Sequence, residues 1–272
     1  MAQLLLRGEP LVDPQGNPAQ IEAVLFDKDG TLSISEPQLL TLAQARVLLC
    51  LEAVAPALHA PLQPLLERAY GLRAEGICPA GITAVASREH NLIATATALV
   101  QVGMGWPEAL ALSEQVFAEA DAADARRHAG AHHTSATTAG LLPWLQQLQA
   151  AGVPCAVISN DDMAGIEQFL ASHGLRPFFP VLWSAEHRPR KPDPAAVHGV
   201  CDQLGVPASR CALIGDANSD LRMAVAAGIP HPLALGYTAA WSTPPPLAEP
   251  HPLVHHWQEL SLAEAPKGGP LG

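Results

Sequence analysis

Short apolar runs, each followed by polar residues and then by a helical pattern, recur along this chain. Strands are expected at residues 21–26, 153–158, 181–183, 211–214 and 232–235. Asp161 and Asp193 are expected as the N-caps of two of the helices that follow. Strands that alternate with helices build a parallel sheet with helices on both faces. The sequence therefore predicts an α/β fold in which the polar residues after the strands gather at one edge of the sheet.

A long segment rich in Ala and Leu interrupts this alternation after the first strand. Its periodicity predicts helices at 36–55, 60–72, 84–102 and 107–128, and no convincing strand. Because the segment leaves after one strand and returns before the next, we interpret it as an inserted all-helical domain. The expected domains are residues 1–33 with 136–272 as the core and 34–135 as the insertion. The small and polar residues 131–140 are expected to form a hinge, and the proline-rich residues after Trp241 a tail with a mobile end.

The composition argues against several classes of binding partner. The chain has 26 Asp and Glu against 15 Lys and Arg, a formal net charge of -11, and no run of basic residues. This disfavours a surface for nucleic acid or for an anionic membrane. The five cysteines contain no Cys-x-x-Cys pair and fit neither a disulfide framework nor a zinc site. No segment has the roughly 18 apolar residues of a membrane span, so we expect a soluble cytoplasmic protein, of an oligomeric state that the sequence does not indicate.

The most informative motif is FDKDGTL, residues 26–32, at the end of the first expected strand. If the strand geometry continues, Asp27 and Asp29 project to one side and Lys28 to the other. Two carboxylates so placed can divide nucleophilic attack and proton transfer between them. Gly30 permits a tight turn whose backbone amides can approach a phosphate. Asp and Gly are also ordinary turn formers, so the motif alone fits a plain strand-to-turn junction as well.

Three later motifs also follow expected strands. Ser159 and Asn160 offer a hydroxyl and backbone amides at a helix start, which suits a phosphate oxygen but equally suits helix capping. Lys191 lies in RPRKPDP, where prolines restrict the backbone around one cation. Asp216 and Asp220 lie in GDANSD, residues 215–220, where two acids could also simply favour the helix dipole.

Together these motifs would collect four carboxylates and one lysine at one sheet edge. Like charges in a partly shielded site repel strongly, so a cation is expected among them. A hard divalent ion with oxygen ligands fits, and Mg²⁺ fits best because it commonly combines one or two carboxylates with waters and a substrate phosphate.

In their order along the chain, FDKDGTL, ISN, RKPDP and GDANSD resemble the four motifs of the haloacid dehalogenase superfamily, and the chain is similar to its phosphoglycolate phosphatase-like subgroup with a helical cap. The resemblance implies a Rossmann-like core and a cap domain formed by the insertion. It implies a phosphatase that acts on a small phosphorylated metabolite, with Asp27 as the nucleophile that forms an aspartyl-phosphate. Asp29 would be the general acid and base, and Lys191 would neutralise the phosphoryl group and orient Asp27.

The resemblance also implies binding roles. Gly30, Ser159 and Asn160 would bind the substrate phosphate together with the lysine. Magnesium would be held by Asp27, by the backbone carbonyl of Asp29 and by Asp216, with Asp220 in support. The sequence departs from the family pattern at Lys28, where an apolar residue is common, and after Leu32, where the usual acidic residue is missing.

Individual residues also distinguish between the activities known in this superfamily. Asp29 argues against a dehalogenase, which lacks the second acid, and the absence of any lysine between Lys28 and Lys191 argues against a phosphonatase, which needs one in its cap. A sugar-phosphate mutase uses the same motifs and stays open as an alternative. So does a catalytically silent binding protein on this scaffold, whereas a phospho-accepting receiver domain is disfavoured by the large insertion.

Substrate selectivity is expected to lie in the insertion. The segment 76–91 contains Gly and Pro residues that break the helical pattern, and Arg73, Arg88 and His90 border it or lie in it. These three residues are candidates for contact with an anionic or hydroxylated substrate. Exposed polar residues on helices would look the same in the sequence.

Overall fold

The computed structural model describes residues 2–13, 15–128 and 135–264. The chain divides into two compact units, one of residues 1–33, 137–240 and 246–272 and the other of residues 34–136 and 241–245. This division differs from the predicted domains at Ala136 and at 241–245, which pack with the helical unit. The chain passes between the units in two short strands, β5 (Ser33–Ile34) and β8 (Ala136–Thr137).

The first unit contains a six-stranded sheet in which every pair of neighbouring strands is parallel. This confirms the predicted α/β class and the Rossmann-like arrangement. The strand 181–183 has its predicted bounds, and the others differ by a few residues. In spatial order the strands are β10 (Val181–Trp183), β9 (Cys155–Ile158), β4 (Ala23–Phe26), β11 (Cys211–Gly215), β12 (Ala234–Tyr237) and β13 (Leu253–Val254).

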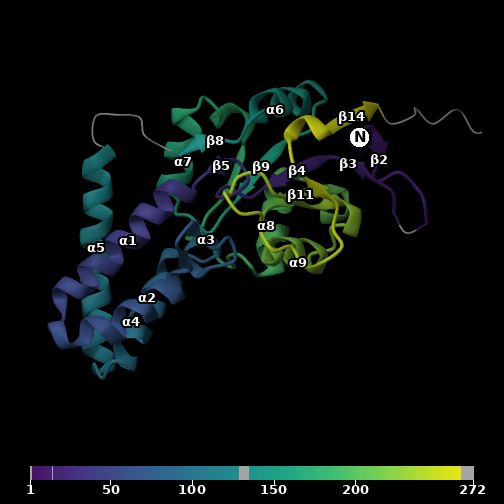
Figure 1. The fold of residues 1–272 in the computed structure, drawn as a ribbon. Coiled ribbons are helices and arrows are strands. Elements are labelled where there is room, and N and C mark those ends of the chain that lie inside the picture. Colours follow the sequence, from purple (N-terminus) through teal and green to yellow (C-terminus); the bar gives the residue numbers. More distant parts are fainter. Residues whose placement is uncertain (1, 14, 129–134, 265–272) are drawn as a thin grey trace, which may run out of the picture. The chain divides into compact units, whose positions relative to one another are not determined.

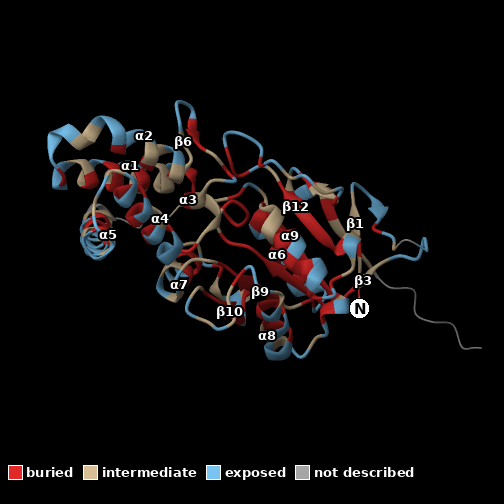
Figure 2. Cartoon of the chain, turned by 90° about the horizontal axis from the view of Figure 1, so that it is seen from below, coloured by how far each residue is buried: buried red, intermediate tan, exposed pale blue. Residues whose placement is uncertain are grey.

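Helices cover both faces of this sheet, as Figure 1 shows for α6 on one side and α8 and α9 on the other. The coverage explains why all four residues of β4 are buried and apolar, since a strand between two helical layers has no solvent-facing side. Figure 2 shows the strands buried between helices whose outer faces are exposed. The helices of this unit are α6 (Leu141–Ala150), α7 (Met163–Ser172), α8 (Pro194–Leu204) and α9 (Asn218–Ala226).

Two helix starts test the predicted caps. Asp193 caps α8 as predicted, because its side chain accepts a hydrogen bond from the backbone of Ala195. The predicted cap at Asp161 is wrong: Asp162 caps α7 by accepting from the backbone N–H of Gly165 at 2.7 Å. The carboxylate of Asp161 instead contacts Lys28.

A second, antiparallel sheet forms from the ends of the chain. It contains β1 (Ala2–Leu6), β2 (Glu9–Pro10), β3 (Gln20–Ile21) and β14 (Leu260–Glu264), with β14 and β1 paired along five residues. The expected strand at 21–26 is therefore split at Glu22 between β3 and β4. The expected tail after Trp241 is wrong in part, since it contains β13 and β14. The last dozen residues were expected to be mobile, but residues 261–264 belong to β14, and residues 265–272 lie outside the described part of the chain.

The second unit is built from helices, with one hairpin that the sequence analysis did not predict. The expected helix at 84–102 is divided because Ala86 and Ser87 are extended, and Ser87 caps the second part through His90 N–H at 3.4 Å. The elements are α1 (Glu36–Ala53), α2 (His59–Tyr70), α3 (Ile82–Val85), α4 (Arg88–Gln101) and α5 (Trp106–His128), and the hairpin strands are β6 (Leu72–Arg73) and β7 (Gly76–Ile77).

Short 3-10 turns join elements in both units at η1 (Pro56–Leu58), η2 (Arg176–Phe178), η3 (Ala208–Arg210), η4 (His231–Leu233) and η5 (Trp257–Glu259). Within the described parts of the chain, no helix is long and apolar enough to cross a membrane.

One buried carboxylate explains why residues 241–245 pack with the helical unit. Glu36 accepts hydrogen bonds from the backbone N–H of Ser242 at 2.6 Å and from its hydroxyl at 2.8 Å. The same carboxylate accepts from the backbone N–H of Ile77 in the hairpin at 3.2 Å. Glu36 therefore joins the start of α1, the hairpin and the returning segment.

Gly76 is expected to be intolerant of a side chain. Its φ is +134°, and a Cβ there would lie 2.5 Å from Oε1 of Glu36. We expect Gly76→Ala to reduce the free energy of unfolding by about 3 kcal/mol, from backbone strain and overlap together. Gly103→Ala is the matched control, because Gly103 also has a positive φ of +96° but nothing within 4 Å. Equal losses in urea unfolding of the two variants would contradict the role given to Glu36.

Candidate active site

The carboxyl ends of three neighbouring parallel strands lie side by side at one edge of the sheet. β4 lies between β9 and β11, with Phe26 opposite Val157 on one side and Ile214 on the other (Figure 1). Each of these strands is followed directly by a polar residue: Asp27 after β4, Ser159 after β9 and Asp216 after β11. Parallel strands of equal register end together, which is why residues distant in the sequence come close here.

Lys191 is a buried cation next to Asp27. Its ammonium group lies 2.6 Å from Oδ1 of Asp27 and 2.8 Å from Oδ1 of Asp220, and it donates to the carbonyl of Ile158 at 3.3 Å. Burial by itself lowers the pKa of a lysine, but Asp220 and Asp27 outweigh it and raise the pKa of Lys191. The side chain is therefore charged and joins β4, β9 and α9.

Three buried carboxylates face one another around this lysine. Oxygens of Asp27, Asp216 and Asp220 lie within 4.8 Å of one another, a spacing that suits one cation. Burial raises the pKa of Asp27 to about 6, against the opposing effect of Lys191 and with a further contribution from Asp220. One lysine thus leaves negative charge uncompensated, and a hard divalent ion fits the oxygen-only donor set.

Three residues outside the predicted set, Gly215, Thr31 and Thr138, help to hold this group in place. A Cβ on Gly215 would lie 2.5 Å from Oδ2 of Asp220, so the close approach of that carboxylate requires glycine. Thr31 donates to Oδ1 of Asp216 at 3.5 Å, and its carbonyl accepts from the hydroxyl of Thr138 at 2.8 Å. For the contact between Thr31 and Asp216, the only sequence signal is the position of Thr31 in the motif DGTL. Nothing in the sequence indicates Thr138.

Asp29 is not one of these three carboxylates, although its charge also raises the pKa of Asp27. Gly30, at φ +81°, turns the chain after β4, and the carboxylate of Asp29 accepts from the hydroxyl of Ser33 at 3.2 Å. It also accepts from the ammonium group of Lys28 at 2.7 Å. The expectation that Lys28 projects away from Asp29 is wrong, because the strand ends at Phe26 and the turn brings the two side chains together.

The loop after β9 carries the predicted phosphate-binding residues. Ser159 is buried, its N–H donates to the carbonyl of Trp183 at 2.8 Å, and its hydroxyl accepts from the N–H of Asp161 at 3.1 Å. Asn160 is half-buried beside it. Their position next to the strand of Asp27 suits a phosphate, and that role stays a prediction.

The three candidate specificity residues lie in the helical unit. Arg73 donates to the thiol of Cys78, and the backbone of His90 is bonded to Ser87. Arg88 is paired with Asp121 at 2.6 Å, so its guanidinium group is engaged within the unit. Their contact with a substrate stays a prediction.

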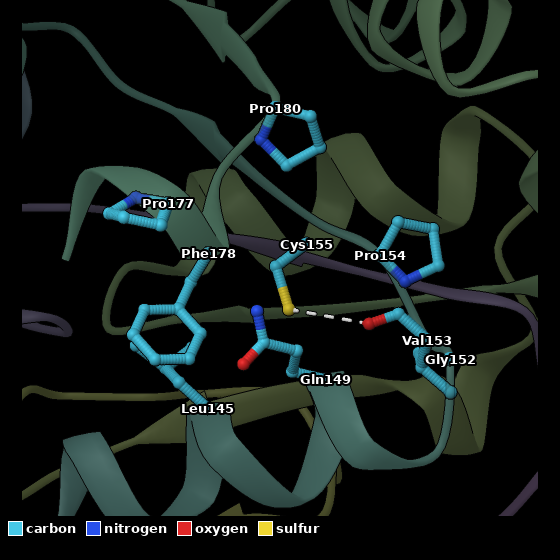
Figure 3. Close-up of a pocket in the computed structure, with 9 residues that line it drawn as sticks. All are labelled: Leu145, Gln149, Gly152, Val153, Pro154, Cys155, Pro177, Phe178 and Pro180. Atoms are coloured by element: carbon cyan, nitrogen blue, oxygen red, sulfur yellow. Dashed lines mark hydrogen bonds between the residues drawn. The ribbon is translucent and has the colours of Figure 1, made fainter.

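A cavity of about 230 Å³ lies at the other end of the sheet (Figure 3). Cys155, the first residue of β9, lines it with Gln149, Phe178 and several prolines, whereas the loop with Ser159 and Asn160 follows the last residue of that strand. Burial raises the pKa of the Cys155 thiol to about 12, so the thiol is protonated and unreactive. This cavity is not part of the candidate site.

The chain is similar to several curated phosphoglycolate phosphatases. One from Thiobacillus denitrificans is 30% identical over 216 residues, which cover 78% of this chain and 82% of that protein. One from Pseudomonas savastanoi pv. phaseolicola is 34% identical over 130 residues, which cover 47% of each chain. The chain thus spans about half the length of several of the curated relatives it matches.

Solved structures share the fold. A protein from Haemophilus somnus described as a predicted phosphoglycolate phosphatase superposes with a TM-score of 0.62 at 18% identity, over 88% of this chain and 95% of that one. The sequence itself matches the family of hydrolases described as haloacid dehalogenase-like over residues 21–228, which include all four motifs. The chain therefore belongs to the haloacid dehalogenase-like hydrolase family.

Proposed function

We propose that this chain is a magnesium-dependent phosphatase that hydrolyses a small phosphorylated metabolite through an aspartyl-phosphate on Asp27. The observation that carries the proposal is the placement of Asp27 at the end of β4, bound to the buried Lys191 inside a group of three carboxylates. The names of the relatives support a phosphatase and make phosphoglycolate the first substrate to test.

The residues divide the reaction into two transfers. Asp27 attacks the phosphorus atom while the leaving oxygen takes a proton from Asp29, which breaks the ester bond and leaves the phosphoryl group on Asp27. Asp29 then takes a proton from water, which attacks the phosphorus, and phosphate leaves with Asp27 restored. Lys191 is already 2.6 Å from Asp27 and neutralises the oxygens of the group in transfer.

Magnesium would be held by the carboxylates of Asp27 and Asp216 and by the backbone carbonyl of Asp29. Asp220 would support this site. When bound, it supplies positive charge opposite the carboxylates and the phosphate oxygens. The first unit is the catalytic core in this proposal, and the helical unit is the cap domain, with Arg73, Arg88 and His90 as candidate contacts to the substrate.

The deciding experiment measures phosphate release from phosphoglycolate and a panel of other small phosphate esters, with Mg²⁺ and with EDTA. We expect release from at least one ester in Mg²⁺ and its loss in EDTA. Release that is undiminished in EDTA would contradict the metal requirement. Conversion of a sugar phosphate to its isomer without release of phosphate would favour the mutase alternative.

Asp29→Asn is expected to lower turnover by about 10² to 10⁴, the usual cost of a lost general acid and base. Asparagine keeps the size of the side chain and the backbone carbonyl, so the loss reports proton transfer. The measurement is steady-state phosphate release from the best ester of the panel. Turnover equal to that of the wild type would remove Asp29 from the mechanism.

Magnesium is expected to raise the melting temperature of the wild-type protein. At a concentration 100-fold above its dissociation constant, an ion that binds only the folded state adds about 2.7 kcal/mol. Asp216→Asn should abolish the shift, whereas Glu22→Gln, at the opposite end of β4, should keep it. Because the native pKa of Asp27 is about 6, above its ordinary 3.8, protons compete for this ligand below that pH and the shift should shrink. An unchanged shift in Asp216→Asn would place the ion elsewhere.

A further inference from the structure

Lys28 occupies a place that family members commonly fill with an apolar residue, and its ammonium group lies between two carboxylates. It is 2.7 Å from Oδ1 of Asp29 and 3.0 Å from Oδ2 of Asp161. It also lies 5.5 Å from the ring centre of Phe169 on α7. The side chain therefore bridges the turn after β4 and the loop after β9.

The burial of Lys28 shows that this bridge is not an incidental surface contact. Only 6% of the residue is exposed, and a buried ammonium group is tolerated where carboxylates compensate it. Burial lowers the pKa of Lys28, but Asp29 and Asp161 outweigh it and the net change is upward. The group is thus a fixed positive charge.

Asp161 is a rigid anchor for this charge. Its carbonyl accepts from the N–H of Ala185 at 2.8 Å, and its own N–H donates to the hydroxyl of Ser159 at 3.1 Å. Gly165 makes room for it, since a Cβ there would lie 2.5 Å from Oδ2 of Asp161. A displacement of Asp161 would therefore also move Ser159.

Asp29 needs such an anchor. A general acid acts only within hydrogen-bond reach of the proton it transfers. Asp29 lies on a turn, and 23% of its side chain is exposed. Its carboxylate is held by the hydroxyl of Ser33 at 3.2 Å and, at a shorter distance of 2.7 Å, by the ammonium group of Lys28. We propose that Lys28 is a positioning residue: its ammonium group, held by Asp161, keeps the carboxylate of Asp29 in place for proton transfer to the leaving group. This inference rests on the proposed function.

Lys28→Met tests this proposal, because methionine keeps the length of the side chain and removes the charge. The readout is kcat/KM for two esters, phosphoglycolate and 2,4-dinitrophenyl phosphate. The alkoxide of the first leaves only with a proton, whereas the phenolate of the second leaves without one. A positioning role predicts a loss of about 10- to 100-fold for phosphoglycolate, part of the full effect of a general acid, and less than about 3-fold for the aryl ester.

Asp161→Asn is the second variant and keeps the proposal testable if Lys28→Met does not fold. It should lower kcat/KM for phosphoglycolate in the same selective way, and the double variant should be no worse than Lys28→Met alone. Arg210→Met is the matched control, since Arg210 pairs with Glu22 at 3.1 Å at the opposite ends of β11 and β4. It should leave the ratio between the two esters unchanged.

Equal losses on both esters would overturn the proposal, because they would mean a structural role or direct contact with the phosphate. Independent, additive effects of the two substitutions would overturn it as well. The proposed function fails separately: if the wild-type protein releases phosphate from no ester of the panel, the chain is not this phosphatase. If the wild type is active and Lys28→Met leaves the ratio unmoved, only the role of Lys28 falls.

Discussion

Asp27→Asn is expected to abolish phosphate release, by at least about 10⁴-fold. The amide of asparagine is a poor nucleophile and carries no charge, so the first transfer has no acceptor. The change is nearly isosteric, and Lys191 keeps Asp220 as a partner at 2.8 Å. The loss should therefore come from chemistry rather than from unfolding.

The measurement combines steady-state phosphate release with intact-protein mass spectrometry after an acid quench. Wild-type protein mixed with substrate should show a phosphorylated form, and Asp27→Asn should show none. Asp202→Asn makes the same chemical change on the exposed face of α8 and should behave like the wild type. A phosphorylated form in Asp27→Asn would place the nucleophile on another residue and remove the central step of the proposed function.

The strands that carry the candidate site could be predicted because their signal is local. β4, β9 and β11 are short apolar runs that end at Asp, Ser and Asp residues, and a parallel sheet brings such ends together. The contact between Lys191 and Asp27, 164 positions apart, follows from that topology and from the motif order. Residue types, the order of the motifs along the chain and the charge imbalance were therefore available from the sequence, whereas the spatial order of the strands was not predicted.

Local side-chain geometry was less accessible. Asp161 and Asp162 are equally good helix caps in the sequence, and the choice between them is decided by Lys28, which draws Asp161 away. The predicted direction of Lys28 is wrong because it assumes strand alternation through Asp29, whereas the strand ends at Phe26 and the turn begins there. Such choices depend on partners that are distant in the sequence.

The strands near the chain end were missed for a different reason. β13 has two residues and stands among prolines, so it has no periodicity to detect. β14 is recognisable only through its partner β1, which lies more than 250 positions away. In the same way, the packing of residues 241–245 with the helical unit depends on hydrogen bonds from Ser242 to the carboxylate of Glu36. No sequence motif indicates this contact.

Lys191→Met is expected to cost both activity and stability. Removing the cation leaves the buried carboxylates of Asp27 and Asp220 without compensation, which typically costs about 3–5 kcal/mol. The deficit should depend on pH in a defined direction. Burial already raises the native pKa of Asp27 to about 6, and Lys191 opposes that rise, so the pKa should climb further in the variant. The native state then binds more protons than the unfolded state above the ordinary pKa of 3.8, and stability recovers as the pH falls.

Urea unfolding at about pH 8 and about pH 5.5, with and without Mg²⁺, measures this dependence. The deficit of Lys191→Met should be largest at the higher pH without the ion and smaller in Mg²⁺, which supplies the missing positive charge. Arg210→Met breaks a half-exposed pair in the same unit and should lose no more than about 1 kcal/mol at either pH. A deficit that grows as the pH falls, or that matches the control, would mean that the carboxylates around Lys191 do not carry the charge assigned to them. The case for a cation at this sheet edge would then fail as well, because it rests on the same excess of negative charge.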